Sequence, residues 1–479
     1  MTSSAHQVAI IGGGISGLST AFAIQEECQR TGLEIDCTVI EGSARFGGKI
    51  YTNHIDDFVI EAGPDSFLTT KPWAFELCEK LGITDQIINT NSSNSQTFCF
   101  AKGQMRELPQ GLVGFVPTRV SALFSGGLIS PLGMFRMGWE WFVPRDNDVE
   151  RDESLAAFFR RRLGTEAFDY FIEPLVAGIY AGDANELSLK ATFPRFYELE
   201  QQYGSLIKGM RAQQASRKPA TSIAAPKRSM FATLQGGLGD LVEALVKRIE
   251  SGGANLQIGH HVLEVNPVIG PSTGYSLVLD NRTQIMADDV VFATPAYVTS
   301  HLLKSHYPRV SELLARIPYS STATISLAFH TKDVKSFIKG FGFVVPRIEG
   351  KAFIAATWTS LKWSNRSKPD QTLIRCYVGG IGREQILEED DSSLVSYIRG
   401  QLKEMVGISH EPIFTEIHRW NRAMPQYICG HGQRLQEIRS LAEEIEGLHL
   451  TGAAFDGLGI PDCIREGIRV GTEIVQSNG

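Results

Sequence analysis

The chain has 479 residues and a formal net charge of -7, with 43% hydrophobic and 21% charged residues. This composition excludes a disordered protein and allows two or three domains with large buried cores. The acidic balance and the lack of a Lys/Arg-rich block give no reason to expect nucleic acid as a partner.

Seven cysteines are scattered along the chain, and no two of them are spaced as C-x-x-C. This pattern disfavours a disulfide framework or a zinc site and fits a reducing compartment. No charged and then apolar leader precedes the first strand pattern, so secretion is not indicated. One uncharged run, Val120–Phe135, contains three glycines and a proline, and it is too short to span a bilayer. We expect a soluble, cytoplasmic protein in which this run is a candidate contact to a membrane surface.

The first motif lies at the start of the chain. An apolar run ending at Ile11 predicts a buried parallel strand, and Leu18–Gln29 predicts a helix. Between them, Gly12 to Gly17 match G-x-G-x-x-G. These glycines allow the tight turn, the approach of the backbone to a pyrophosphate and the packing of the helix on the strand. The phosphates would lie at the positive N-terminus of the helix.

A second predicted strand, Cys37–Glu41, ends in an acid suited to a ribose hydroxyl. Along the sequence, Glu41 lies farther from Gly12 than the usual spacing of about 20 residues. A long helix and the loop Thr31–Asp36 would account for the additional residues. The stretch Arg45–Lys49 resembles the R-x-G-G-[RK] motif of FAD-binding proteins of the glutathione-reductase type, so FAD is the predicted dinucleotide. No second fingerprint follows a strand. This indicates that the chain has no NAD(P)H domain and that the electrons come from the substrate.

The later segments predict a return to the first sheet and then a separate domain. Strand-like runs at 256–258, 262–265, 275–279 and 290–293 follow a predicted helix at 239–250, and Val262 would lie beside the adenine. Residues 308–418 predict a mixed sheet with a helix near 392–405, and residues 110–190 are mostly helical. We interpret Arg160–Arg162 as a solvated helix face and Lys208–Ser229 as a mobile loop. The histidines show no metal-ligand spacing, so no metal site is predicted.

Three further segments carry a resemblance to a known family. Leu450–Gly467 places a glycine run between a strand and a helix that begins near Pro461. Together with Glu61–Ser66 and Pro174–Asp183, it resembles the porphyrinogen oxidases of the amine-oxidase superfamily, in particular the soluble oxygen-dependent type of Gram-positive bacteria. The resemblance implies the oxidation of coproporphyrinogen III to coproporphyrin III in haem biosynthesis, and also of protoporphyrinogen IX. FAD is the carrier, O2 is the acceptor, and product transfer to ferrochelatase is a further hypothesis.

The resemblance also implies a fold and a set of site residues. The fold is an α/β protein with a Rossmann-like FAD-binding domain (5–52, 230–298 and 420–479), a substrate domain with a mixed sheet (53–95, 195–229 and 299–419) and a helical domain (96–194). The predicted cofactor-binding residues are Gly12, Gly13, Gly14, Ile15, Ser16, Gly17, Glu41, Gly42, Gly48, Lys49, Gly63, Pro64, Asp65, Ser66, Val262, Trp420, Gly459, Ile460 and Pro461. The predicted substrate contacts are Lys71 for a propionate, Gly178 for the pyrrole nitrogens and Phe343 for the macrocycle. No catalytic side chain is assigned, because the N5 atom of the flavin would accept the hydride.

Three alternatives use the same scaffold. Flavin amine oxidases share the N-terminal motif, but the covalent-flavin pattern S-G-G-C-Y is absent and Cys463 follows G-I-P-D instead. Phytoene-desaturase-like enzymes are a second enzymatic alternative. GDP-dissociation inhibitors are binding proteins without flavin, and the glycine motifs at both ends of the sequence argue against that class.

Overall fold

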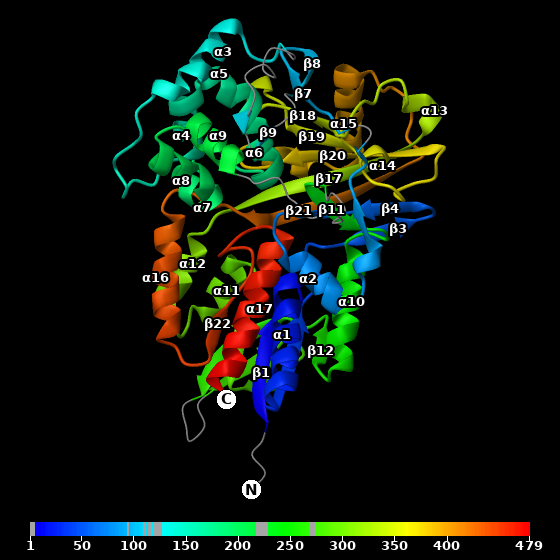
Figure 1. The fold of residues 1–479 in the computed structure, drawn as a ribbon. Coiled ribbons are helices and arrows are strands. Elements are labelled where there is room, and N and C mark those ends of the chain that lie inside the picture. Colours follow the sequence, from blue (N-terminus) through cyan, green and yellow to red (C-terminus); the bar gives the residue numbers. More distant parts are fainter. Residues whose placement is uncertain are drawn as a thin grey trace.

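The computed structural model describes residues 5–92, 95–108, 112–113, 116–117, 127–216, 229–268 and 274–479. The part of the run Val120–Phe135 before residue 127, and residues 217–228 of the predicted loop, lie outside this description. Figure 1 shows the described chain as two halves, with both termini in the lower half.

The lower half is built on a five-stranded parallel sheet with the order β12-β2-β1-β16-β22. Its strands are β1 (His6–Ile11), β2 (Ile35–Glu41), β12 (Asn255–Ile258), β16 (Asp289–Phe292) and β22 (Leu448–Leu450). Successive side chains of a strand point to opposite faces. Val8 and Ile10 therefore pack with helices on one face, whereas Ala9 and Ile11 pack into a second core on the other. Burial on both faces explains why β1 reads as an uninterrupted apolar run.

Helices and a small sheet cover the two faces of this parallel sheet. The helices are α1 (Ile15–Thr31), α2 (Trp73–Lys80), α10 (Gly239–Ser251), α11 (Ala296–Leu303), α12 (Pro308–Ala315), α16 (His431–Glu443) and α17 (Ile460–Ser477). The small antiparallel sheet contains β13 (Val262–Val268), β14 (Gly274–Leu279) and β15 (Gln284–Ala287). The predicted runs at 262–265 and 275–279 therefore do not join the first sheet, and only 256–258 and 290–293 do.

The upper half contains a seven-stranded mixed sheet with the order β21-β17-β20-β19-β18-β7-β8. Its strands are β7 (Thr97–Ala101), β8 (Gln104–Glu107), β17 (Tyr319–His330), β18 (Gly342–Val344), β19 (Phe353–Trp358), β20 (Gln371–Gly379) and β21 (Phe414–Pro425). All neighbouring pairs are antiparallel except β18 with β7. The helix α15 (Asp391–Val406) packs on this sheet, close to the bounds that the sequence predicts.

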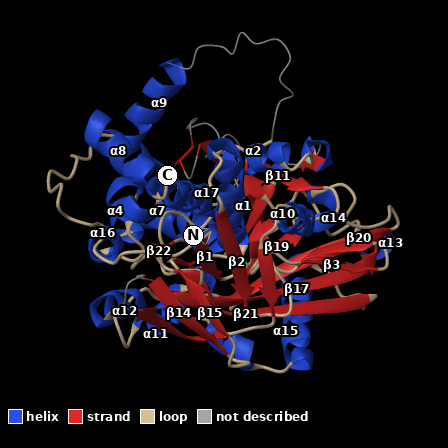
Figure 2. Cartoon of the chain, turned by 90° about the horizontal axis from the view of Figure 1, so that it is seen from below, coloured by secondary structure: helices blue, strands red, loops and turns tan. Residues whose placement is uncertain are grey.

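Short strands connect the two halves, and further helices lie beside the sheet. The short strands are β3 (Thr52–Ile55), β4 (Phe58–Glu61), β5 (Phe67–Leu68), β6 (Ile87–Asn89) and β11 (Phe231–Leu234). The helices are α3 (Pro131–Gly138), the 3-10 turn η4 (Trp139–Phe142), α4 (Leu155–Leu163), α6 (Glu173–Tyr180), α7 (Leu189–Thr192), α8 (Pro194–Tyr203) and α9 (Leu206–Ser216). Figure 2 shows α4, α7, α8 and α9 grouped to one side of the strands.

Two pairs of elements, β7 with β8 and α8 with α9, lie in other parts of the structure than the predicted domain boundaries place them. Strands β7 and β8 belong to the large sheet although 96–108 was assigned to the helical domain, and α8 and α9 pack in the helical core although they were assigned to the substrate domain. Residues 208–216 are helical rather than a loop. The three-domain division itself remains a prediction.

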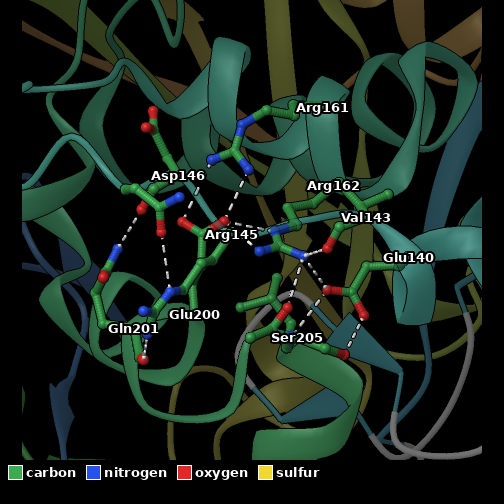
Figure 3. Close-up of polar contacts among 12 residues, drawn as sticks. Glu140, Val143, Arg145, Asp146, Arg161, Arg162, Glu200, Gln201 and Ser205 are labelled. Carbon is green, nitrogen blue, oxygen red and sulfur yellow. Dashed lines mark hydrogen bonds and ion pairs between the residues drawn. The ribbon is translucent and has the colours of Figure 1, made fainter.

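The interpretation of Arg160–Arg162 as a solvated face is wrong for Arg162, whose side chain is 0% exposed. Its guanidinium group binds the carboxylate of Glu200, with Nε 2.7 Å from Oε1, and it donates to Glu140 Oε1 at 3.3 Å and to the carbonyl oxygen of Val143 at 2.8 Å. Glu140 in turn accepts hydrogen bonds from the hydroxyl group of Ser205 and the backbone N–H of Leu206. Figure 3 shows this buried network joining η4, α4 and the α8–α9 turn.

Candidate cofactor and substrate site

Two glycine-rich loops lie against each other at the end of β1. The backbone N–H of Gly47 donates to the carbonyl oxygen of Gly13 at 2.8 Å, and Gly14 and Gly47 form a parallel bridge. A Cβ atom added to Gly48 would lie 3.2 Å from the Cα of Gly14. Only residues without side chains allow this close approach of backbones. We call the two loops, residues 12–17 and 41–49, together with residues 459–461, the cofactor cradle.

The N-terminus of α1 lies at the cradle, and no protein side chain caps it with a hydrogen bond. Its N-cap is Gly14, no side chain caps the helix, and its first turn carries no acid. Gly12 has φ +109°, and a Cβ on Gly17 would lie 2.0 Å from the carbonyl oxygen of Gly12. The free backbone N–H groups and the helix dipole make this end a site for an anion such as a pyrophosphate.

Glu41 lies directly beside this helix start, because β1 and β2 are neighbours and Ile11 pairs with Ile40. Its Oε2 accepts a hydrogen bond from the backbone N–H of Gly13 at 2.8 Å. The long sequence spacing from Gly12 to Glu41 is thus taken up by the 17 residues of α1.

Gly42 and Val262 lie at the same end of the cradle. The ring of His261 packs against Gly42, where an added Cβ would lie 2.5 Å from its Nδ1 atom, and Val262 is the next residue and partly buried. This geometry is consistent with the predicted adenine side of the site.

The third part of the cradle comes from the far end of the sequence. A Cβ on Gly467 would lie 2.4 Å from the carbonyl oxygen of Ser16, and one on Gly471 would lie 2.5 Å from that of Thr20. The two helices therefore run parallel in close contact, as Figure 1 shows for α1 and α17. This contact places the N-terminus of α17, which Gly459 caps without a side chain, beside that of α1. Ile460 and Pro461 form its first turn.

Gly63 lies against Lys49, the last residue of the cradle loop 41–49. A Cβ on Gly63 would lie 1.9 Å from the carbonyl oxygen of Lys49, so only glycine fits. The ammonium group of Lys49 has no hydrogen-bond or ion-pair partner among the described residues, and burial lowers its pKa. The indole N–H of Trp420 donates to the carbonyl oxygen of Ala62 at 2.8 Å.

Arg375 is a residue of this region that the sequence analysis missed. It donates to the carbonyl oxygens of Ala62 and Gly63, and so holds the segment against β20. A single arginine in the otherwise uncharged strand 371–379 was the available signal, since a buried arginine requires polar partners.

The predicted cofactor residues after Gly63 have partners within the protein. The Oδ2 atom of Asp65 lies 2.8 Å from the ammonium of Lys362, and Oδ1 accepts from the hydroxyl of Ser66 at 2.7 Å. Burial alone would raise the pKa of Asp65, but the charges of Lys362 and Arg375 hold it well below its usual range. Asp65 therefore remains a carboxylate, and the structure shows it bound to Lys362, a partner that the sequence analysis did not identify. Pro64 precedes this pair and is partly buried.

The three predicted substrate residues lie in different surroundings. Gly178, in the last turn of α6, is exposed, and an added Cβ would meet nothing within 4 Å. Lys71 is bound to Asp462 in the first turn of α17. Phe343 is 1% exposed and stacks on Phe353 within the core of the large sheet, so the structure does not place it on an accessible pocket wall.

Neither metal ligands nor membrane spans are found in the part of the chain that the structure describes. There, no three His, Cys, Asp or Glu residues are grouped so that they could hold a metal ion, and no helix is long and apolar enough to cross a bilayer.

The cradle fits FAD on three observations. Two helix N-termini without side-chain caps meet where glycine backbones leave room for a dinucleotide. The buried Oγ1 atom of Thr451, at the end of β22, has no hydrogen-bond partner among the described residues. Lys49 supplies a partly buried cation that has no counterion among the described residues.

Comparisons with known proteins agree with this arrangement over nearly the whole chain. The family model described as flavin containing amine oxidoreductase matches residues 15–475. The coproporphyrinogen III oxidase of Bacillus subtilis (strain 168) is 37% identical over 98% of this chain and 97% of its own length, and that of Staphylococcus aureus (strain NCTC 8325 / PS 47) is 34% identical over 98% of each. A solved structure of a protein from Exiguobacterium sp. 255-15 has a TM-score of 0.86 and 30% identity, and covers 99% of both chains. The chain belongs to the flavin containing amine oxidoreductase family, and its cofactor is FAD.

Proposed function

We propose that this protein is an FAD-dependent oxidase of haem biosynthesis that converts coproporphyrinogen III to coproporphyrin III and also accepts protoporphyrinogen IX. The full-length similarity to coproporphyrinogen III oxidases carries the proposal. The cradle built from both ends of the chain and the open surface at Gly178 support it.

The reaction removes six electrons and six protons from the porphyrinogen and reduces three O2 to three H2O2. Bound FAD supplies the chemistry of hydride acceptance from a meso carbon and delivery of electrons to O2. The chain then has to bind the macrocycle and keep its propionates oriented. No metal or nucleophile is needed, because aromatisation of the substrate drives the reaction.

A direct test mixes the purified holoenzyme with coproporphyrinogen III without oxygen. Bleaching of the flavin absorbance followed by porphyrin fluorescence on admission of O2 is the expected result. Bleaching by a primary amine, but not by either porphyrinogen, would favour an amine oxidase instead. A purified protein that never carries flavin would point to a binding protein of the GDP-dissociation inhibitor type.

Lys71 is our proposed contact for a substrate propionate. A protein of net charge -7 repels a four-propionate anion at long range, so the substrate entrance needs a local cation. Lys71 is 37% exposed and lies at the first turn of α17. Lysine provides a point charge rather than the bidentate fork of arginine.

We place the enzyme in the cytoplasm, in peripheral contact with a membrane surface. Leu132, Phe135, Trp139 and Phe142 are exposed together on α3 and η4, and the ring centroids of Trp139 and Phe142 are 5.3 Å apart. Lys208 and Arg211 lie over the neighbouring Trp141 ring. Exposed aromatic residues beside cations favour an anionic lipid surface.

Co-flotation with phosphatidylglycerol vesicles tests the membrane contact. The wild-type protein should float with these vesicles, and the Phe135→Ser, Trp139→Ser double variant should not. If both proteins stay in the pellet fraction, the contact is refuted. Direct transfer of the porphyrin to ferrochelatase is a further proposal, which substrate-channelling kinetics would test.

A further inference from the structure

Lys71 is held by a carboxylate of the protein. The Nζ atom of Lys71 lies 2.7 Å from Oδ1 and 2.5 Å from Oδ2 of Asp462, so both oxygens face the ammonium. The Asp462 side chain is only 5% exposed, whereas that of Lys71 is 37% exposed. The lysine can therefore reach solvent while the aspartate stays buried.

This ion pair lies next to the cofactor cradle. Asp462 is the third residue of the helix that Gly459 caps. Burial and, to a smaller extent, the charge of Asp462 raise the pKa of Tyr180, which ends the helix carrying Gly178. The carboxylate therefore lies beside the cradle, and its negative charge acts on the end of α6.

Asp462 keeps a second cation if Lys71 moves away. Nη1 of Arg465 lies 3.7 Å from Oδ1 of Asp462, and this guanidinium is fixed by Glu466 and by the carbonyl oxygen of Asp456. A buried carboxylate left without any cation would be costly. Because Arg465 stays in place, Lys71 can exchange partners without that full cost.

We propose that Asp462 is an internal substitute for a substrate propionate, which occupies Lys71 in the free enzyme and is exchanged for the propionate on binding. The inference rests on the function proposed above and assigns Asp462 a role in substrate selection. The exchange replaces one carboxylate–ammonium pair by another. A macrocycle without carboxylates cannot form the second pair, so it cannot displace Asp462 from Lys71. Carboxylated porphyrinogens are selected, and Asp462 lowers their affinity.

The experiment measures binding of the product, coproporphyrin III, to the oxidised holoenzyme through the shift of its Soret band. Asp462→Asn keeps the size of the side chain and removes its charge, so it should tighten binding by about fivefold, the effect of one partly exposed ion pair. Coproporphyrin III tetramethyl ester, which has no free carboxylate, should bind wild type and variant equally. The flavin absorbance of the variant should equal that of the wild type.

Two further variants separate exchange from general electrostatics. Glu473→Gln removes the same charge from the same helix but leaves Lys71, Asp462 and Arg465 in place, and it should change the affinity much less. In the Lys71→Met background, Asp462→Asn should no longer tighten binding.

Several outcomes would overturn the inference. Unchanged or weaker binding of coproporphyrin III by Asp462→Asn would mean that the pair is only structural, and an equal gain in the Lys71→Met background would exclude competition for Lys71. By contrast, failure of the wild type to bind coproporphyrin III, or to be reduced by its porphyrinogen, would refute the proposed function itself.

Discussion

Glu61 is a buried acid whose pKa is raised by the fold. It is 2% exposed, and its carboxylate accepts hydrogen bonds from the backbone N–H of Leu238 at 2.7 Å and the hydroxyl of Thr52 at 2.8 Å. Burial outweighs these bonds and raises its pKa to about 7. The folded protein therefore retains a proton that the unfolded chain releases near the ordinary pKa of 4.5.

We predict that Glu61 makes the protein less stable as the pH rises from about 4.5 to about 7. In this range the folded state binds more protons than the unfolded state, so the free energy of unfolding falls with pH by up to about 1.4 kcal/mol per pH unit. Urea unfolding at pH 5, 6, 7 and 8 would measure the slope. Glu61→Gln should flatten it, and the exposed control Glu312→Gln should not. An unchanged slope in Glu61→Gln would assign the dependence to other groups.

Among single residues, the sequence predicted those whose role depends on their immediate neighbours. Gly12, Gly14 and Gly17 lie within one turn, so their spacing alone indicates the close backbone contact that the structure has between Gly12 and Gly17. Phe343 and Arg162 were misinterpreted, because their surroundings come from distant segments. Arg162 binds Glu200, 38 residues away, which no local pattern reveals.

Contact between α1 and α17 decides how the two helix N-termini face the cofactor. Gly467 and Gly471 are spaced by four residues and lie on one side of α17, where they meet the backbone of α1. The sequence analysis predicted that a helix begins near Pro461, but not that it packs on α1. Its close approach depends on glycine rather than on side-chain packing.

We predict that Gly471→Ala lowers both thermal stability and flavin content. The added Cβ would lie 2.5 Å from the carbonyl oxygen of Thr20, so the helices must separate, at about 1–3 kcal/mol for an overpacked core. Gly400→Ala is the matched control, because this helical glycine of α15 has no atom within 4 Å of an added Cβ and should gain about 1 kcal/mol in helix propensity. Differential scanning calorimetry and the ratio of flavin to protein absorbance measure the two effects. If both variants behave alike, the close contact does not position the cradle.

The apolar cores of the molecule differ in one respect: the core of the helical region also contains buried ion pairs. Arg162 connects η4, α4 and the α8–α9 turn, whereas separate apolar cores cover the two faces of the parallel sheet. The sequence predicted the α/β class, the mixed sheet and the helical region. It grouped β7 with the helical region, whereas β7 joins the large sheet by pairing with β18, 245 residues later in the chain.

We predict that Arg162→Met destabilises the helical region before the rest of the molecule. The change leaves Glu140 and Glu200 buried with fewer cations, at about 3–5 kcal/mol. Limited proteolysis should cut within 131–216 at temperatures where the flavin absorbance is still that of the folded protein. Arg160→Met, which alters a half-exposed side chain, is the control. A single cooperative loss of helix and flavin in Arg162→Met would show that the region does not unfold separately.

The contact between Ser16 and Gly467 has a consequence for protein synthesis. A ribosome adds about 5–20 residues per second, so roughly 20 to 90 s separate the two halves of the cradle as they are made. During that interval β1 lacks its neighbour β16 for most of the time, and α1 exposes the face that α17 later covers. The nascent chain therefore completes its FAD site only after α17 has been synthesised, and until then the face of α1 that α17 covers stays unpaired.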